Sequence, residues 1–297
     1  MKKFLTSLVI LLAAAGCQKP DPVVVDPGET TSPKIEVTPI APADTNAGGT
    51  SVDSTGVPPG DATRFSAFLL VSRVVYDAGP AATHVETFST AYFADRNRPL
   101  TANGRTIGYY GIDLVSNSLL PLTINDLAMF RIPYRLRIPG ALRDTVFGSV
   151  FVRDVASIYQ PNTVMTWRAQ SPMSMSQFTT QIVTPDNVRL LEPAGGSMLR
   201  RSDPLVLRWE GRGDLFIVIS RINPVTKRTI PFLKIHPKVN LGRVVIEPAI
   251  LHLLPPERYF VLTFIVSNRF EKMVVGQYPG MILVQAASIH NSYVEFQ

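Results

Sequence analysis

Histidines are the first residues to consider for chemistry, because imidazole can act as a general base and as a metal ligand near neutral pH. The chain has four, His84, His236, His252 and His290, and none belongs to a helical His-Glu-x-x-His motif. His236 and His252 could meet only through the fold, and a single histidine on a strand or turn is usually a hydrogen-bonding group. The carboxylates are scattered singly, which argues against the carboxylate pair of a glycoside hydrolase.

Other catalytic motifs are missing from the sequence. It contains no Gly-x-Ser-x-Gly elbow, no Asp-rich calcium loop and no glycine-rich phosphate loop. Cys17 is the only cysteine, so no disulfide within the chain is expected. The sequence therefore predicts a protein that is not an enzyme and has no cofactor and no metal site.

Cys17 ends a segment with its own pattern of charge and hydropathy. Lys2 and Lys3 precede an apolar run from Phe4 to Ala14, as in a secretory signal peptide. The run is shorter than the about 20 residues that a membrane-spanning helix needs. The segment Ala14-Ala15-Gly16-Cys17 resembles the lipobox of bacterial lipoproteins, whose cysteine is lipidated and becomes the new N-terminus. An ordinary secreted protein with one free thiol is the alternative.

The lipoprotein resemblance implies a location and a first partner. Residues 1–17 would be the signal peptide and lipobox, and the mature chain would be anchored to the membrane through lipid on Cys17. Lipoproteins carry two or three acyl chains, which suffice for stable attachment. We therefore expect an anchor in the outer membrane, with the protein on the cell surface or on the periplasmic face.

Residues 18–61 are predicted to be a disordered linker. The segment is rich in Pro, Thr and Asp, lacks aromatic residues and has no sustained apolar period. Such a composition cannot bury enough apolar surface to offset the entropy lost on ordering. The expected result is a stalk between the anchor and the folded part.

Charge is unevenly divided along the chain. The net charge is +6, of which Lys2 and Lys3 belong to the signal peptide. Residues 18–61 hold two lysines and seven acidic residues, which leaves +9 for residues 62–297. A basic folded part favours acidic protein surfaces, anionic glycans or lipid head groups. No nucleic-acid motif accompanies this charge, so no nucleic-acid partner is expected.

Residues 62–186 are predicted to form an antiparallel β-sandwich domain. Short runs rich in β-branched and aromatic residues alternate with turn residues, and no helical period persists beyond about two turns. Asn103-Gly104 is the clearest hairpin signal, because both residues tolerate positive φ. Pro133 argues for an edge strand or a bulge. Asn125-Asp126-Leu127-Ala128 is interpreted as the start of one helical turn.

Residues 187–297 are predicted to form a second sandwich. Leu205, Leu207 and Trp209 alternate with other residues and give one strand a buried face. With Trp209, the spacing of Leu253, Pro255 and Tyr259 resembles the tyrosine corner of fibronectin type III and other immunoglobulin-like domains. The resemblance covers about 110 residues and implies a binding or spacer module. The predicted fold class is thus all-β, with two antiparallel sandwiches after a disordered stalk.

The strand that follows the corner supplies a candidate interaction face. If Tyr259 faces the core, the alternate residues point outward. These are Phe260, Leu262, Phe264 and Val266. Large exposed apolar patches usually mark an interface. The alternative is that the first domain or a terminal segment covers this face.

Two functions from different classes follow. The first is a non-catalytic lipoprotein of the cell envelope that acts as a structural or protein-interaction module. The alternative is a carbohydrate-binding accessory lipoprotein, with sugars stacked on exposed aromatic residues. Candidates for stacking are Tyr109, Tyr110, Tyr134, Tyr159 and Trp167. However, Met165, Trp167 and Ala169 share one strand face, which is typical of a core. A hydrolase assembled only by the fold is a third, weaker hypothesis.

Overall fold

The computed structural model describes residues 35–39, 65–79, 82–102, 105–111, 122–136, 145–169, 178–222, 229–274 and 280–297. Within this part of the chain nearly every element is a strand, and the single helix described is α3, Pro248–Leu251. The all-β fold class is therefore confirmed. Residues Pro33–Gln297 form one compact unit.

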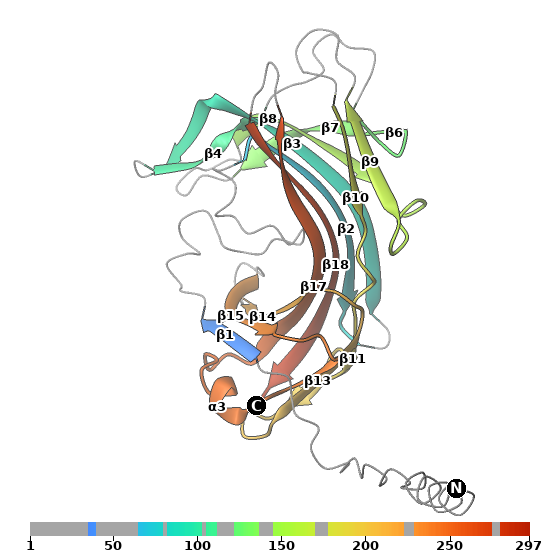
Figure 1. The fold of residues 1–297 in the computed structure, drawn as a ribbon. Coiled ribbons are helices and arrows are strands. Elements are labelled where there is room, and N and C mark those ends of the chain that lie inside the picture. Colours follow the sequence, from blue (N-terminus) through green and yellow to red (C-terminus); the bar gives the residue numbers. More distant parts are fainter. Residues whose placement is uncertain are drawn as a thin grey trace, which may run out of the picture. The chain divides into compact units, whose positions relative to one another are not determined.

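A long, twisted sheet organises this unit (Figure 1). Its strand order is β1-β15-β14-β17-β18-β2-β3-β8-β7, with β4 added to β3 and β12 added to β18. The bounds are β1 Ile35–Pro39, β2 Ala67–Asp77, β3 Thr83–Ala102, β4 Arg105–Gly111, β7 Phe130–Leu136, β8 Thr145–Asp154, β12 Met198–Leu199, β14 Leu215–Ile222, β15 Thr229–Pro237, β17 Tyr259–Val274 and β18 Gly280–Phe296.

Two smaller sheets cover one face of the long sheet. One has the order β10-β9-β5-β6 and the other the order β11-β13-β16. Their bounds are β5 Thr123–Ile124, β6 Leu127–Ala128, β9 Val164–Ala169, β10 Phe178–Val183, β11 Arg189–Glu192, β13 Leu205–Glu210 and β16 Arg243–Ile246. In Figure 1 the long strands β17, β18, β2 and β3 curve, and β9, β10, β11 and β13 lie on their convex side. We call this covered side the sandwich face and the other side the concave face.

The C-terminal strands form a β-sandwich of three strands on four. Three strands, β11-β13-β16, face four, β15-β14-β17-β18, which is the three-on-four arrangement of immunoglobulin-like folds. Trp209 on β13 is 3% exposed, and its ring centroid lies 5.8 Å from that of Phe264 on β17. The apolar core between the two layers also contains Ile217, Ile219, Leu233 and Ile235.

The N-terminal strands build a second sandwich on the same long sheet. The sheet β10-β9-β5-β6 packs over β18, β2, β3 and β8, and Trp167 is fully buried between the two layers. Its indole N–H donates to the hydroxyl of Ser89 at 3.2 Å. Met165 and Ala169 are buried in the same core, so the prediction of a core face on this strand is confirmed.

The predicted boundary between residues 62–186 and 187–297 does not separate two sheets. The last strand, β18, pairs in parallel with β2 from Ile282↔Ala67 to Ser292↔Asp77. The two sandwiches therefore share one sheet instead of forming two separate domains. The shared pair is also parallel, whereas the sequence predicted antiparallel pairing throughout.

The predicted disordered linker contains one ordered strand. β1 pairs antiparallel with β15, from Ile35↔Pro237 to Pro39↔Leu233. Ile35 and Val37 pack against the C-terminal core, which explains why a Pro-rich segment is held here. The remainder of residues 18–61, like Cys17 and the signal peptide, lies outside the described residues.

Turns and edges agree with the sequence at two places and differ at a third. Ala102 pairs with Arg105, as expected for a two-residue hairpin at positions 103–104, which themselves lie outside the described residues. Pro133 lies on β7, the edge strand, at a register shift, as predicted. Asn125 and Asp126 do not start a helix: their φ angles of 44° and 64° form the turn of the β5–β6 hairpin.

Candidate functional site

The predicted interaction face on β17 is wrong. Phe260, Leu262 and Phe264 are fully buried and Val266 is 1% exposed, all inside the C-terminal sandwich. Tyr259, expected in the core, is 55% exposed. The predicted alternation was therefore shifted by one residue, which exchanges the two faces of a strand.

The doubled residues of the corner explain the shift. Leu253-Leu254-Pro255-Pro256 allows two frames, and in the structure Leu254 and Phe260 are the buried residues. Leu254 is 5% exposed, whereas Leu253 is 53% exposed. Phenylalanine thus takes the place of the corner tyrosine, and it has no hydroxyl to bond back to the chain.

Arg201 supplies hydrogen bonds at this corner. Its guanidinium donates to the carbonyl of Leu254 at 3.0 Å and to that of Glu257 at 2.7 Å. The same group lies 5.6 Å from the ring centroids of Phe260 and Phe296. Arg201 therefore ties the corner to the sandwich core.

With the sandwich face occupied, the concave face is the other broad surface of the long sheet. Side chains of β2, β14, β17 and β18 on this face form an apolar cluster of their own: Val74, Val218, Ile265, Ala287 and Ile289, with Tyr76 and Phe88 beside it. Both faces of the central strands are therefore apolar. For this reason the alternation of residues in the sequence does not indicate which face of these strands lies inside the sandwich.

A cavity of about 100 Å³ lies against this face. Its floor includes Val218, Val261 and Ile289, each at most 2% exposed. Its rim includes the exposed Thr229 and the half-buried Tyr293. The other lining residues are Tyr76, Ser220, Pro231, Thr263 and Asn291.

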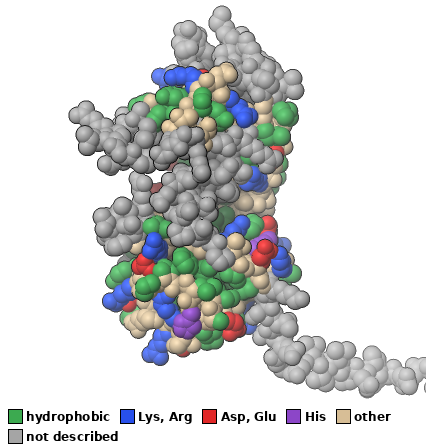
Figure 2. All heavy atoms as spheres, turned by 90° about the vertical axis from the view of Figure 1, so that its left-hand side faces the viewer, with side chains coloured by type: hydrophobic (Ala, Val, Ile, Leu, Met, Phe, Trp, Pro, Cys, Tyr) green, Lys and Arg blue, Asp and Glu red, His purple; other side chains and the backbone are tan. Residues whose placement is uncertain are grey.

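The described lining of the cavity mixes apolar and polar side chains and carries no charged one. Thr263 donates its hydroxyl proton to the Asn291 side-chain oxygen at 2.8 Å, which fixes both groups across β17 and β18. Serine, threonine and tyrosine hydroxyls add donors and acceptors. Figure 2 views the molecule from this side, where positive and negative side chains are interspersed in the coloured part. The lining therefore suits a neutral ligand with hydrogen-bonding groups.

The predicted stacking aromatics do not form one row. Trp167 and Tyr159 are buried, and the Tyr159 hydroxyl donates to the carbonyl of Ala287 at 3.3 Å. Tyr110 packs edge-on against Phe147, with ring centroids 5.2 Å apart. The ring of Tyr134 packs against the ring of Tyr92. The hydroxyl of Tyr92 in turn donates a hydrogen bond to the backbone carbonyl of Tyr109.

The histidines lie in separate environments. His236 on β15 contacts Asp214 at 2.7 Å and stacks on Phe216 at 4.5 Å, while His252 caps the C-terminus of α3. His84 contacts Glu86 at 3.3 Å. Among the described residues, no group of three or more His, Cys, Asp or Glu side chains could hold a metal ion.

His290 is the one buried histidine of the four. It is 3% exposed, and neither ring nitrogen has a hydrogen-bond partner within the described structure. The Asp77 carboxylate lies 3.8 Å away, with Arg73 and Arg189 as the other charged neighbours. Burial is the largest influence and lowers the pKa of His290, and the two arginines act in the same direction, although Asp77 opposes them.

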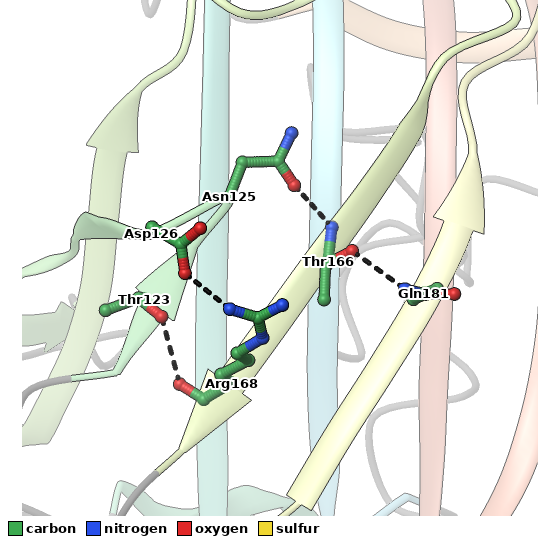
Figure 3. Close-up of polar contacts among 6 residues, drawn as sticks. All are labelled: Thr123, Asn125, Asp126, Thr166, Arg168 and Gln181. Atoms are coloured by element: carbon green, nitrogen blue, oxygen red, sulfur yellow. Dashed lines mark hydrogen bonds and ion pairs between the residues drawn. The ribbon is translucent and has the colours of Figure 1, made fainter.

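A polar cluster on the outer side of the small N-terminal sheet is structural in character (Figure 3). Arg168 donates to Asp126 at 2.6 Å, and the Asn125 side chain accepts from the backbone N–H of Thr166 at 2.7 Å. Gln181 donates to the Thr166 hydroxyl at 3.2 Å. These groups satisfy one another and hold the β5–β6 hairpin on β9.

Comparisons with known proteins identify no family. No protein-family model matches the sequence, and no curated protein matches it significantly. Within the described residues, no helix is long and apolar enough to cross a membrane.

Proposed function

We propose that this chain is a non-catalytic binding protein of the cell envelope, anchored through lipid on Cys17. It binds its partner through the concave face of the long sheet. One observation supports this most: both small sheets pack on the sandwich face, while the cavity opens on the other. Ligand sites usually combine apolar walls with a few polar groups, and the described lining has both. The cavity of about 100 Å³ is smaller than the roughly 300–1,000 Å³ of a typical small-molecule pocket, so the partner would contact the face around it as well.

A matched pair of substitutions tests the binding face. Thr229 lies at the rim of the cavity and Thr179 lies on β10, and both are exposed threonines on strands. The complex of the chain with its partner is extracted in mild detergent, and its mass is measured. Thr229→Arg should lower this mass to that of the free chain, whereas Thr179→Arg should leave it unchanged. Equal masses for both variants and the unmodified protein would count against the concave face.

The anchor is tested separately. Cells that express the full chain are given a labelled fatty acid, and Cys17→Ser is the matched variant. Label on the protein that disappears in Cys17→Ser supports the lipid anchor. Equal labelling of both, or none on either, contradicts it.

Carbohydrate binding is the second candidate, and the chemistry of the cavity favours it. At about 100 Å³ the cavity is smaller than an engineered cavity of about 150 Å³ that holds benzene, so a sugar would place only one edge of its ring in it and would rest on the surrounding face. Hydroxyl and amide groups beside apolar walls match a neutral pyranose. Saturation transfer to a panel of neutral monosaccharides should be seen with the unmodified protein and lost in Tyr293→Ala; no transfer to any sugar would exclude this candidate.

A further inference from the structure

The edge of the long sheet at β15 is covered by an unusual strand. β1 has five residues and is separated from β2 by 27 residues of chain, from 40 to 66. β15 is held on its other side by β14, through pairs such as Ile217↔Ile235. Removing β1 would therefore leave β15 in the sheet, with one row of backbone groups unpaired.

The contacts of β1 define what this edge accepts. Ile35 and Val37 pack on the C-terminal core and are only half-buried. Glu36 points to the other side, where its carboxylate pairs with Lys238. The Lys238 ammonium, followed by His236 and Lys234, lowers the pKa of Glu36. The edge therefore matches an extended segment with apolar, acidic and apolar residues in sequence.

β1 is held by interactions that another strand could replace. Ordering the five residues of β1 costs backbone entropy at each position. The stabilisation from two half-buried side chains and one exposed ion pair offsets only part of this cost. The remaining stabilisation comes from backbone hydrogen bonds, which do not depend on side-chain identity. A competing strand of the same pattern would make the same bonds.

We propose that the β15 edge is a strand-addition site, at which an extended segment of a partner protein with alternating apolar and acidic residues replaces β1. The positive side chains along this edge select an acidic residue at the central position. This site lies at the sheet edge and does not depend on the function proposed for the concave face.

The test uses the full chain with Cys17→Ser and a fluorescent peptide with the sequence of residues 33–40, Pro-Lys-Ile-Glu-Val-Thr-Pro-Ile. Ile35→Asp with Val37→Asp displaces β1. A second variant, Val37→Cys with Ile235→Cys, locks it, because these two residues are paired. We expect the peptide to bind the displaced variant at least tenfold more tightly than the unmodified chain, and the locked variant not at all.

The peptide itself carries the control for charge. A version with lysine in place of Glu36 should bind at least fivefold more weakly. Absence of binding to a displaced variant that remains folded would overturn the proposal, as would equal binding to the locked variant. If the displaced variant does not fold, hydrogen exchange on the unmodified chain decides: β15 amides bonded to β1 should exchange at least tenfold faster than those bonded to β14, and equal protection would overturn the proposal.

Discussion

Replacing Phe264 by alanine tests the assignment of the two faces of β17. Phe264 is fully buried and packs against Trp209, with ring centroids 5.8 Å apart. A fully buried phenylalanine replaced by alanine costs about 3–5 kcal/mol, from lost transfer energy and the cavity left behind. Such a loss is a large part of the roughly 5–15 kcal/mol that stabilises a typical domain.

Phe216 is the matched control on the neighbouring strand. It pairs with Ile265, points to the concave face and is half-buried beside His236. Because part of the ring already contacts solvent, Phe216→Ala should cost only about 1–2 kcal/mol. The two substitutions remove the same atoms from opposite faces of one sheet.

Thermal unfolding followed by tryptophan fluorescence measures both variants. For a unit of this size, about 1 kcal/mol lowers Tm by about 2–4 °C, so Phe264→Ala should lose roughly 6–20 °C. Phe216→Ala should lose no more than about 8 °C by the same conversion. Equal losses, or a larger loss for Phe216→Ala, would refute the assignment of faces.

Two further predictions follow from buried groups. Because the pKa of His290 is lowered in the fold, the unfolded chain takes up the proton first as pH falls below about 6.5, so stability falls on the acid side. His290→Gln should flatten the fall in Tm between about pH 7 and 5, and an unchanged slope would count against it. Arg201→Met should cost about 1–3 kcal/mol, because the carbonyls of Leu254 and Glu257 lose their donor. Arg201→Lys should not restore stability, since an ammonium lacks the planar fork; full recovery in urea unfolding would disprove that role.

The sequence predicted strands well where local pattern was sufficient. From the sequence alone, residues 164–169 and 178–183 are each predicted to form a strand, and β9, Val164–Ala169, and β10, Phe178–Val183, have the same bounds. Both runs are rich in β-branched and aromatic residues and are flanked by residues that do not continue the pattern. Local chemistry of this kind can be read without the rest of the fold.

Side-chain direction on β17 could not be predicted in the same way. Apolar residues stand on both faces of this strand, so their alternation does not indicate which set faces the core. The repeated residues of the Leu-Leu-Pro-Pro corner also permit two alignments with the tyrosine-corner spacing. Burial of Leu254 rather than Leu253 decides between them. That choice depends on packing against other strands.

Long-range pairing left no local signal. The sequence predicts two short final strands, near residues 282–284 and 293–296, with His290, Asn291 and Ser292 between them. In the structure these three residues lie inside one continuous strand, β18, where Asn291 pairs with Thr263 across the sheet. Its parallel partner, β2, lies far earlier in the chain, so nothing in either segment indicates the pairing.

The central claim is that the concave face binds a partner, and site-specific photo-crosslinking in intact cells tests it most directly. A photoreactive residue replaces Thr229 at the cavity rim or, as the control, Thr179 on β10. We expect one discrete adduct from position 229 that is absent from position 179. Adducts of equal yield from both positions, or from position 179 alone, would contradict the claim.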